Sequence, residues 1–111
     1  MGVRRPLRFM ARQLDLDEEQ VEKMAAILDD LKTQRAQAQV DRRKSIGTFA
    51  DAFLGDEFDS ERVKQACHDR VDSDRLVEDA VAKALERTFA VLDEGQRKRL
   101  AYLLRSGGLT I

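Results

Sequence analysis

Apolar residues recur along this chain with the spacing of an α-helix. One series consists of Val21, Met24, Leu28 and Leu31, and a later one of Val63, Cys67, Val71, Val77, Val81, Leu85, Phe89 and Leu92. Steps of mostly three and four residues place each series on one face of a helix. The pattern predicts two long helices, from about residue 17 to 54 and from about residue 60 to 92.

Helix breakers are rare within these stretches. The polar segment KTQRAQAQVDRRKS, residues 32–45, contains no Gly or Pro and many good helix formers, so the first long helix is expected to run through it. The segment GDEFD, residues 55–59, is the clearest turn, and Gly55 is expected to adopt the left-handed conformation that ends many helices. Shorter helices are expected at about 6–13, with the single Pro in the first turn, and at about 94–105.

The expected order is short helix, long helix, turn, long helix, short helix, in a single domain of residues 1–111. A helix of about 38 residues is about 57 Å long, whereas a compact chain of this size has a diameter of about 27 Å. We therefore expect an all-α fold, an elongated antiparallel hairpin of long helices with short flanking helices. Such a thin hairpin buries little on one side, so a homodimer is also expected.

Two segments of the chain repeat the same local pattern. LDEEQVEKMAAIL occupies residues 16–28 and LDEGQRKRLAYLL occupies residues 92–104. In each, an Asp suited to cap a helix is followed three residues later by a Gln, as a capping box requires. The leading Leu, the Asp and the Gln of the two copies are Leu16, Asp17 and Gln20, and Leu92, Asp93 and Gln96.

The repeated segments resemble the Leu-Thr-x-x-Gln motif that Spy/CpxP-like periplasmic proteins use twice. Asp17 and Asp93 stand where that motif has Thr, and both residue types cap helices. The resemblance implies a bent helical hairpin that pairs into a cradle-shaped homodimer and binds unfolded proteins on its concave face without ATP. Relatives of this family inhibit envelope-stress sensor kinases or, like CnrX and ZraP, bind heavy metals. The resemblance also implies a periplasmic location, and we expect a signal peptide or anchor that precedes residue 1.

Composition narrows the function classes further. Charged residues make up 37% of the chain, but the formal net charge is −1. A nucleic-acid partner is not expected, because a polyanion binder carries an excess of basic residues. The chain has one His, one Cys and no Gly-rich phosphate loop, so no enzymatic activity is expected. No apolar run approaches the ~20 residues of a membrane span.

Basic and aromatic residues near the predicted turn are candidates for binding unfolded clients: Arg42, Arg43, Lys44, Phe49, Phe53 and Phe58. Apolar contact and steering by charge together suit loosely held apolar segments. The alternative interpretation is a solvated helix face beside a small local core. Arg4, Arg5 and Arg8 form a basic patch near the N-terminus that either faces a lipid or partner or only aids solubility.

Metal binding is the alternative chemistry. Cys67, His68 and Asp72 are the candidate ligands, with His68 and Asp72 one helical turn apart. One chain supplies only about half a typical site, so two chains would have to combine their clusters, and Cys67 is otherwise expected as a small buried apolar residue. We expect no cofactor, with a divalent transition metal as the alternative. The expected partners are unfolded proteins, a second copy and a membrane-bound stress sensor.

Overall fold

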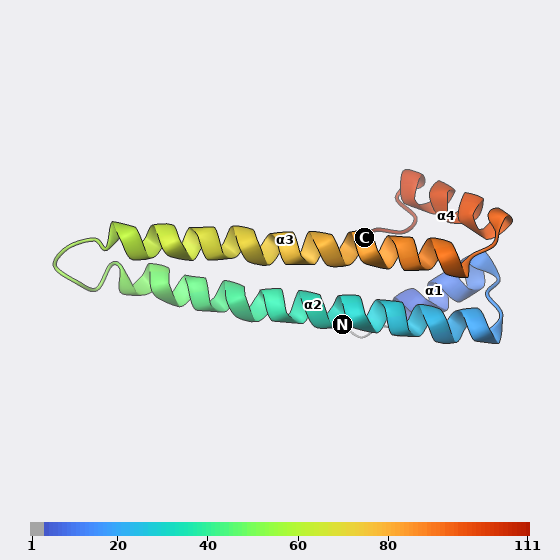
Figure 1. The fold of residues 1–111 in the computed structure, drawn as a ribbon, viewed down its shortest axis with the longest axis horizontal. Helices are drawn as coiled ribbons and strands as arrows, with labels where there is room; N and C mark the ends of the chain where they lie inside the picture. The colour runs from blue at the N-terminus through green and yellow to red at the C-terminus, as the bar shows by residue number, and fades with distance from the viewer. Residues whose placement is uncertain (1–3) are drawn as a thin grey trace. The chain divides into compact units, whose positions relative to one another are not determined.

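The computed structural model describes residues 4–111, and this part of the chain forms four α-helices and no strand (Figure 1). Their bounds are Arg4–Leu14 for α1, Glu18–Asp51 for α2, Ser60–Val91 for α3 and Glu94–Ser106 for α4. The all-α prediction is confirmed. The largest boundary difference is at the end of α2, which was expected near residue 54 and lies at Asp51. None of the described helices is both long and apolar enough to cross a membrane.

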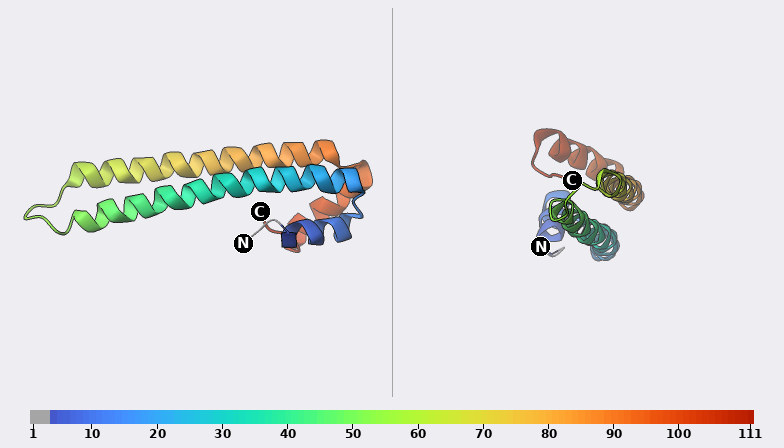
Figure 2. Two further views of the ribbon diagram at one scale, coloured as in Figure 1. Left: turned by 90° about the horizontal axis from the view of Figure 1, so that it is seen from below. Right: turned by 90° about the vertical axis from the view of Figure 1, so that its left-hand side faces the viewer.

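The helices are divided between two compact units. The terminal unit contains the chain up to Lys32 together with Val81–Ile111, and the central unit is Thr33–Ala80. Within each unit, a stretch of α2 lies beside a stretch of α3 that runs in the opposite direction (Figures 1 and 2). The elongated hairpin, the single domain and the homodimer remain predictions.

The terminal unit has a core to which all four helices contribute. Its buried apolar residues are Met10, Leu14, Met24, Ile27, Leu31, Ala84, Leu92 and Leu103. Met24 is only 1% exposed. The short helix α1 therefore packs through Met10 and Leu14, and α4 packs through Leu103. Burial of these side chains, each worth roughly 1.5–3 kcal/mol for a large aliphatic residue, holds the four helix ends together.

The central unit is packed with smaller residues. Ser45 of α2, Ala52 just after the end of α2, and Ala66 and Ser73 of α3 are its buried residues. The Ser73 hydroxyl donates a hydrogen bond of 3.0 Å to Asp41 Oδ2, which satisfies a polar group inside the helix pair. Small side chains in these positions allow the two helices to approach closely, but they bury little apolar area.

The apolar face predicted for α3 is wrong at four of its eight positions, whereas Val63, Val77 and Val81 are half-buried and Leu92 is buried. Cys67 is exposed rather than buried, and so are the large side chains Val71, Leu85 and Phe89. The inward positions of α3 are instead filled by Ala66, Ser73, Ala84 and Thr88. Thr88 can be buried because its hydroxyl donates to the carbonyl oxygen of Ala84 at 2.7 Å, within its own helix. At these positions, an assignment based on hydrophobicity alone therefore fails, because the small side chains are the ones that are buried.

Two backbone positions end helices in the left-handed conformation. Gly107 has φ 80° and its N–H donates to Leu104 O, which closes α4. Asp15, after α1, has φ 52°, and Leu16 N donates to Ala11 O at 3.0 Å. Gly55 was expected to behave in this way but does not, since no other described residue has a positive φ. The turn after α2 is built without that C-cap conformation.

The two glycines Gly107 and Gly47 provide a matched test of this helix ending. Gly107→Ala should lower the free energy of unfolding by about 1 kcal/mol, because a Cβ disfavours positive φ. Gly47→Ala should raise it by about 0.5–1 kcal/mol, because Gly47 is inside α2 and a Cβ there meets nothing within 4 Å. Urea unfolding followed by circular dichroism measures both. The same sign for the two substitutions would contradict the assigned conformations.

Candidate functional site

Both repeated segments form capping boxes in the terminal unit. Gln20 N donates to Asp17 Oδ1 at 2.8 Å, and Asp17 N donates to Gln20 Oε1 at 3.1 Å. In the second copy, Gln96 N donates to Asp93 Oδ1 at 2.8 Å, and Asp93 N donates to Gln96 Oε1 at 3.0 Å. Each box satisfies two backbone N–H groups that a helix N-terminus otherwise leaves without a partner.

The two motif glutamines also bind each other. Gln20 Nε2 donates to Gln96 Oε1 at 2.7 Å, and Gln96 Nε2 donates to Gln20 Oε1 at 3.0 Å. Because the two residues are 76 positions apart in the chain, this pair joins the start of α2 to the start of α4. The sequence pattern predicted the two caps but not their contact.

Each glutamine amide has a further bond to the helix that precedes the other motif. Gln20 Nε2 donates to Val91 O at 3.0 Å, and Gln96 Nε2 donates to Leu14 O at 3.1 Å. A Gln side chain offers two donors and two acceptor sites, and all four are used in both residues. The Gln20–Gln96 pair therefore ties the ends of α1 and α3 to the starts of α2 and α4.

This arrangement explains why the motif carries Gln rather than Glu at its last position. A carboxylate at Gln96 could still accept from the backbone of Asp93, but it would have no hydrogen to donate to Leu14 O or Gln20 Oε1. The two motif leucines differ in burial, since Leu92 is 3% exposed and Leu16 is half-buried. The site holds the helix ends together.

Substitution of Gln96 tests this role. Gln96→Glu and Gln96→Ala should each lower the free energy of unfolding by about 1–3 kcal/mol, because each leaves partly buried hydrogen-bonding groups without partners. Gln65→Ala is the matched control, since Gln65 makes an exposed bond to Asp69 within α3, and it should change stability by less than about 0.5 kcal/mol. Chemical denaturation of the three variants measures the difference.

A double substitution separates the glutamine contact from the two caps. Gln20→Ala together with Gln96→Ala should cost less than the sum of the two single substitutions, by about 0.5–3 kcal/mol, because the shared contact is lost only once. Strict additivity would show that the two amides stabilise the fold independently.

The candidate client-binding residues lie in the central unit, where they divide into two groups. Phe53 and Phe58 are in the loop between α2 and α3, 80% and 55% exposed, and their rings meet edge to face with centroids 5.8 Å apart. Phe49 is half-buried on α2, with the Arg70 guanidinium 5.6 Å from its ring centroid. The structure thus brings two of the three phenylalanines together on the surface.

The basic candidates lie on the polar stretch of α2. Arg42 Nη2 is 3.4 Å from Asp74 Oδ1 on α3, in an exposed ion pair. Arg43 and Lys44 are exposed. An ion pair with both partners this exposed contributes little to stability, so Arg42 can exchange Asp74 for another carboxylate at small cost.

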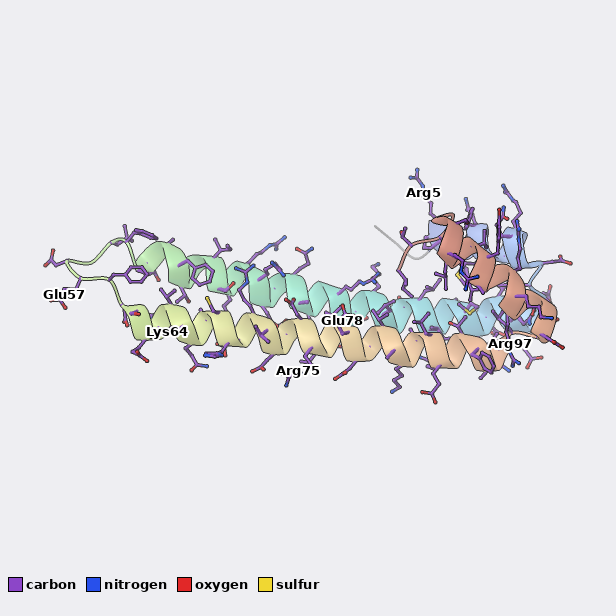
Figure 3. All side chains as sticks on the ribbon, turned by 90° about the horizontal axis from the view of Figure 1, so that it is seen from above. Arg5, Glu57, Lys64, Arg75, Glu78 and Arg97 are labelled. Atoms are coloured by element: carbon purple, nitrogen blue, oxygen red, sulfur yellow. The ribbon has the colours of Figure 1, made fainter. Side chains whose placement is uncertain are left out.

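The loop has two features that the candidate set did not include. Leu54, adjacent to Phe53, is 82% exposed. The segment between Ser45 and Arg62 contains acidic residues and no Lys or Arg, namely Asp51, Asp56, Glu57, Asp59 and Glu61. Glu57 extends from the outer end of the loop (Figure 3). The net charge of the whole chain conceals this feature, whereas the charge of residues 46–61 alone shows an acidic loop with exposed apolar side chains at its centre.

The candidate metal ligands are not gathered into one site within the chain. Cys67 and His68 are both exposed on α3, and Asp72 is exposed further along the same helix. In the part of the chain that the structure describes, no group of three or more His, Cys, Asp or Glu side chains is placed to hold a metal ion. A site that used these residues would have to draw ligands from a second chain.

Comparison with known proteins places the repeated motif in a family. The model of the LTXXQ motif family matches residues 3–104, which include both copies of the motif. Comparisons with curated proteins and with solved structures gave no match.

Proposed function

The chain belongs to the LTXXQ motif family, the family of Spy/CpxP-like periplasmic proteins, and from this premise we propose that it binds unfolded proteins in the periplasm without nucleotide. The proposal requires a surface that holds apolar segments reversibly. The central unit offers such a surface, and no covalent step or cofactor is needed.

One observation carries the proposal: the central unit buries small residues and exposes large apolar ones. Its exposed large apolar side chains are Val40, Ile46, Phe53, Leu54, Phe58, Val71 and Leu76. Scattered exposed apolar residues are common in folded proteins, but a contiguous apolar group at a loop is typical of a binding surface. Phe53, Leu54 and Phe58 form such a group.

The charges around these residues suit weak and varied binding. Arg42, Arg43 and Lys44 attract acidic segments of a client, and the acidic loop attracts basic ones. Phe53 and Phe58 supply the apolar contact. Since exposed charges steer association more than they strengthen it, a client can be released without an energy source. A membrane-bound stress sensor is a further partner that this surface suits.

The first test is suppression of aggregation without nucleotide. Stoichiometric amounts of the protein should keep several unrelated denatured proteins soluble, as followed by light scattering. Phe53→Ser with Phe58→Ser should raise the amount needed for half-suppression by about tenfold, since large aromatic side chains dominate apolar contacts.

Ile111→Ser is the matched control for that variant, because Ile111 is also an exposed apolar residue, 53% exposed, but lies outside the central unit. It should leave suppression unchanged. Circular dichroism should show the same helix content in all variants, because the replaced side chains are mostly exposed. Equal loss of activity in the control, or none in the Phe53/Phe58 variant, would remove this loop from the client surface.

A metal-responsive regulator is the second candidate, and the exposure of Cys67 beside His68 is what favours it. If unfolded-protein binding is the function, calorimetric titration with Zn²⁺, Cu²⁺, Ni²⁺ and Co²⁺ should reveal no tight site, and Cys67→Ala should leave the traces unchanged. Tight binding that disappears in Cys67→Ala or His68→Ala would favour the regulator instead.

A further inference from the structure

Helices α1 and α4 of the terminal unit expose the same arrangement of two cations around an aromatic ring. In each helix, an aromatic residue lies four positions after one basic residue and three positions before another. The two sets are Arg5, Phe9 and Arg12 in α1, and Lys98, Tyr102 and Arg105 in α4. Residues three and four positions apart are neighbours on one face of a helix, and all of these side chains are exposed. Each helix therefore presents a ring between two positive charges.

The two helices are strongly basic, although the chain as a whole is not. They contain eight Lys or Arg residues and one acidic residue, Glu94, whereas the net charge of the chain is −1. Arg8 adds a further exposed cation next to the ring of α1. Glu94 forms an exposed ion pair with Lys98 at 3.4 Å, and such a pair contributes little to stability. The side chain of Arg4, the other member of the expected N-terminal patch, lies outside the described part of the structure.

The two basic faces point to the same side of the terminal unit. Helices α1 and α4 are in contact and lie together on one side of the neighbouring stretches of α2 and α3 (Figure 2). Met10 and Leu14 of α1 and Leu103 of α4 are buried and mark the faces that are turned toward the core. At about 100° per residue, the ring and cations of each helix fall on the opposite face. Figure 3 shows Arg5 extending away from α2 and α3.

Contacts between the two helices hold these faces side by side. Arg99 Nη2 on α4 donates to Gln13 Oε1 on α1 at 2.8 Å, and the Arg99 guanidinium carbon is 5.3 Å from the centroid of the Tyr102 ring. An open depression of about 300 Å³ on α4 is lined by Lys98, Ala101, Tyr102, Arg105 and Ser106. The rings and cations thus form one surface, the α1–α4 face, that extends over two helices.

The chemistry of the α1–α4 face suits phosphate groups at the boundary of an apolar phase. Guanidinium groups bind phosphate oxygens through paired hydrogen bonds. Phe9 and Tyr102, 36% and 60% exposed, offer rings of the kind that gather where an apolar phase meets water. A small anion can contact only a few of these groups, whereas an extended anionic layer can contact the cations and rings of both helices together.

From this complementarity we propose that the α1–α4 face binds the surface of a bilayer that contains anionic phospholipids. Phe9 and Tyr102 then lie among the headgroups, and the Arg and Lys side chains around them contact lipid phosphates. The helices lie on the bilayer without crossing it, as basic amphipathic helices do. This contact uses the terminal unit and does not depend on the binding of unfolded proteins by the central unit.

Sedimentation of the full chain with lipid vesicles tests the proposal. The protein should bind vesicles of about one-third phosphatidylglycerol in phosphatidylcholine, and should not bind vesicles of phosphatidylcholine alone. Raising the NaCl concentration from about 0.1 M to about 0.5 M should weaken binding by at least about tenfold, because salt screens the attraction. Absence of binding to the anionic vesicles, or equal binding to both kinds, would overturn the proposal.

Two variants test the contribution of each helix. The α1 variant carries Arg5→Gln, Arg8→Gln and Arg12→Gln, and the α4 variant carries Lys98→Gln and Arg105→Gln. The partition coefficient on anionic vesicles should fall by at least about tenfold in each, because every basic residue near the surface adds to the attraction. The replaced side chains are exposed, so circular dichroism should show an unchanged helix content. Wild-type binding by both variants would overturn the proposal.

A control variant separates this face from the charge of the whole chain. Arg42→Gln, Arg43→Gln and Lys44→Gln together remove as much charge as the α1 variant does, but from exposed positions of α2 in the central unit. This variant should bind anionic vesicles as tightly as the wild type. A loss equal to that of the α1 variant would show that total charge, rather than the α1–α4 face, controls binding, and would overturn the proposal.

Fluorescence shows where the protein meets the lipid. The chain contains no Trp, so Tyr102→Trp introduces a single reporter whose emission should shift to shorter wavelengths on anionic vesicles as water around the ring is replaced. Phe89→Trp is the matched control, since Phe89 is 59% exposed but lies on α3, and its emission should not shift. Equal shifts in the two variants, or no shift in Tyr102→Trp, would overturn the proposal.

A competition experiment distinguishes lipid from an acidic protein. Polyglutamate added at a charge concentration equal to that of the anionic lipid should leave the Tyr102→Trp protein on the vesicles, because it offers the rings no apolar phase. Complete displacement would identify an acidic protein segment as the preferred partner and would overturn the proposal. No client is present in these measurements, so their failure is distinct from a failure to suppress aggregation.

Discussion

The reciprocal contact between the side chains of Gln20 and Gln96 is the interaction on which the terminal unit depends. Each amide caps its own helix, binds the other amide and holds the carbonyl of a third helix end, so one pair of residues fixes four helix ends. Hydrophobic burial around Met24 and Leu92 supplies cohesion, but burial has no direction. The two amides fix how the helix ends are oriented, because their donors and acceptors are all satisfied in this one mutual placement of the helices.

Small residues between the helices have a different effect in the central unit. Because Ser45, Ala66 and Ser73 occupy the inward positions, the larger apolar side chains of the same helices are left on the surface. A helix pair of this kind gains little from its own apolar residues and presents them to other molecules. The proposed binding of clients draws on these exposed apolar side chains, together with the charges near them.

Local patterns predicted most of the helices and both caps, whereas the contacts between distant parts of the chain could not be read from them. A cap involves residues three positions apart, so Asp17 with Gln20 and Asp93 with Gln96 are visible in the sequence. The Gln20–Gln96 contact spans 76 positions, and only the recurrence of Gln in both segments hints at it. The face of α3 was misassigned at Cys67, Val71, Leu85 and Phe89, because periodicity identified large apolar residues. The buried positions of the helix are instead the small residues Ala66, Ser73, Ala84 and Thr88, some of which are polar.

The terminal unit is assembled from two stretches of the chain that are far apart in the sequence, and this sets an order on its formation. Residues 33–80 are contiguous, so they can associate once the loop and the part of α3 that follows it have emerged. Gln20, by contrast, has to wait for Gln96, which is made 76 residues later. During synthesis or transport in the N-to-C direction, α1 and the first turns of α2 therefore stay without their final partners until α4 has followed, and in that interval they are exposed to proteases.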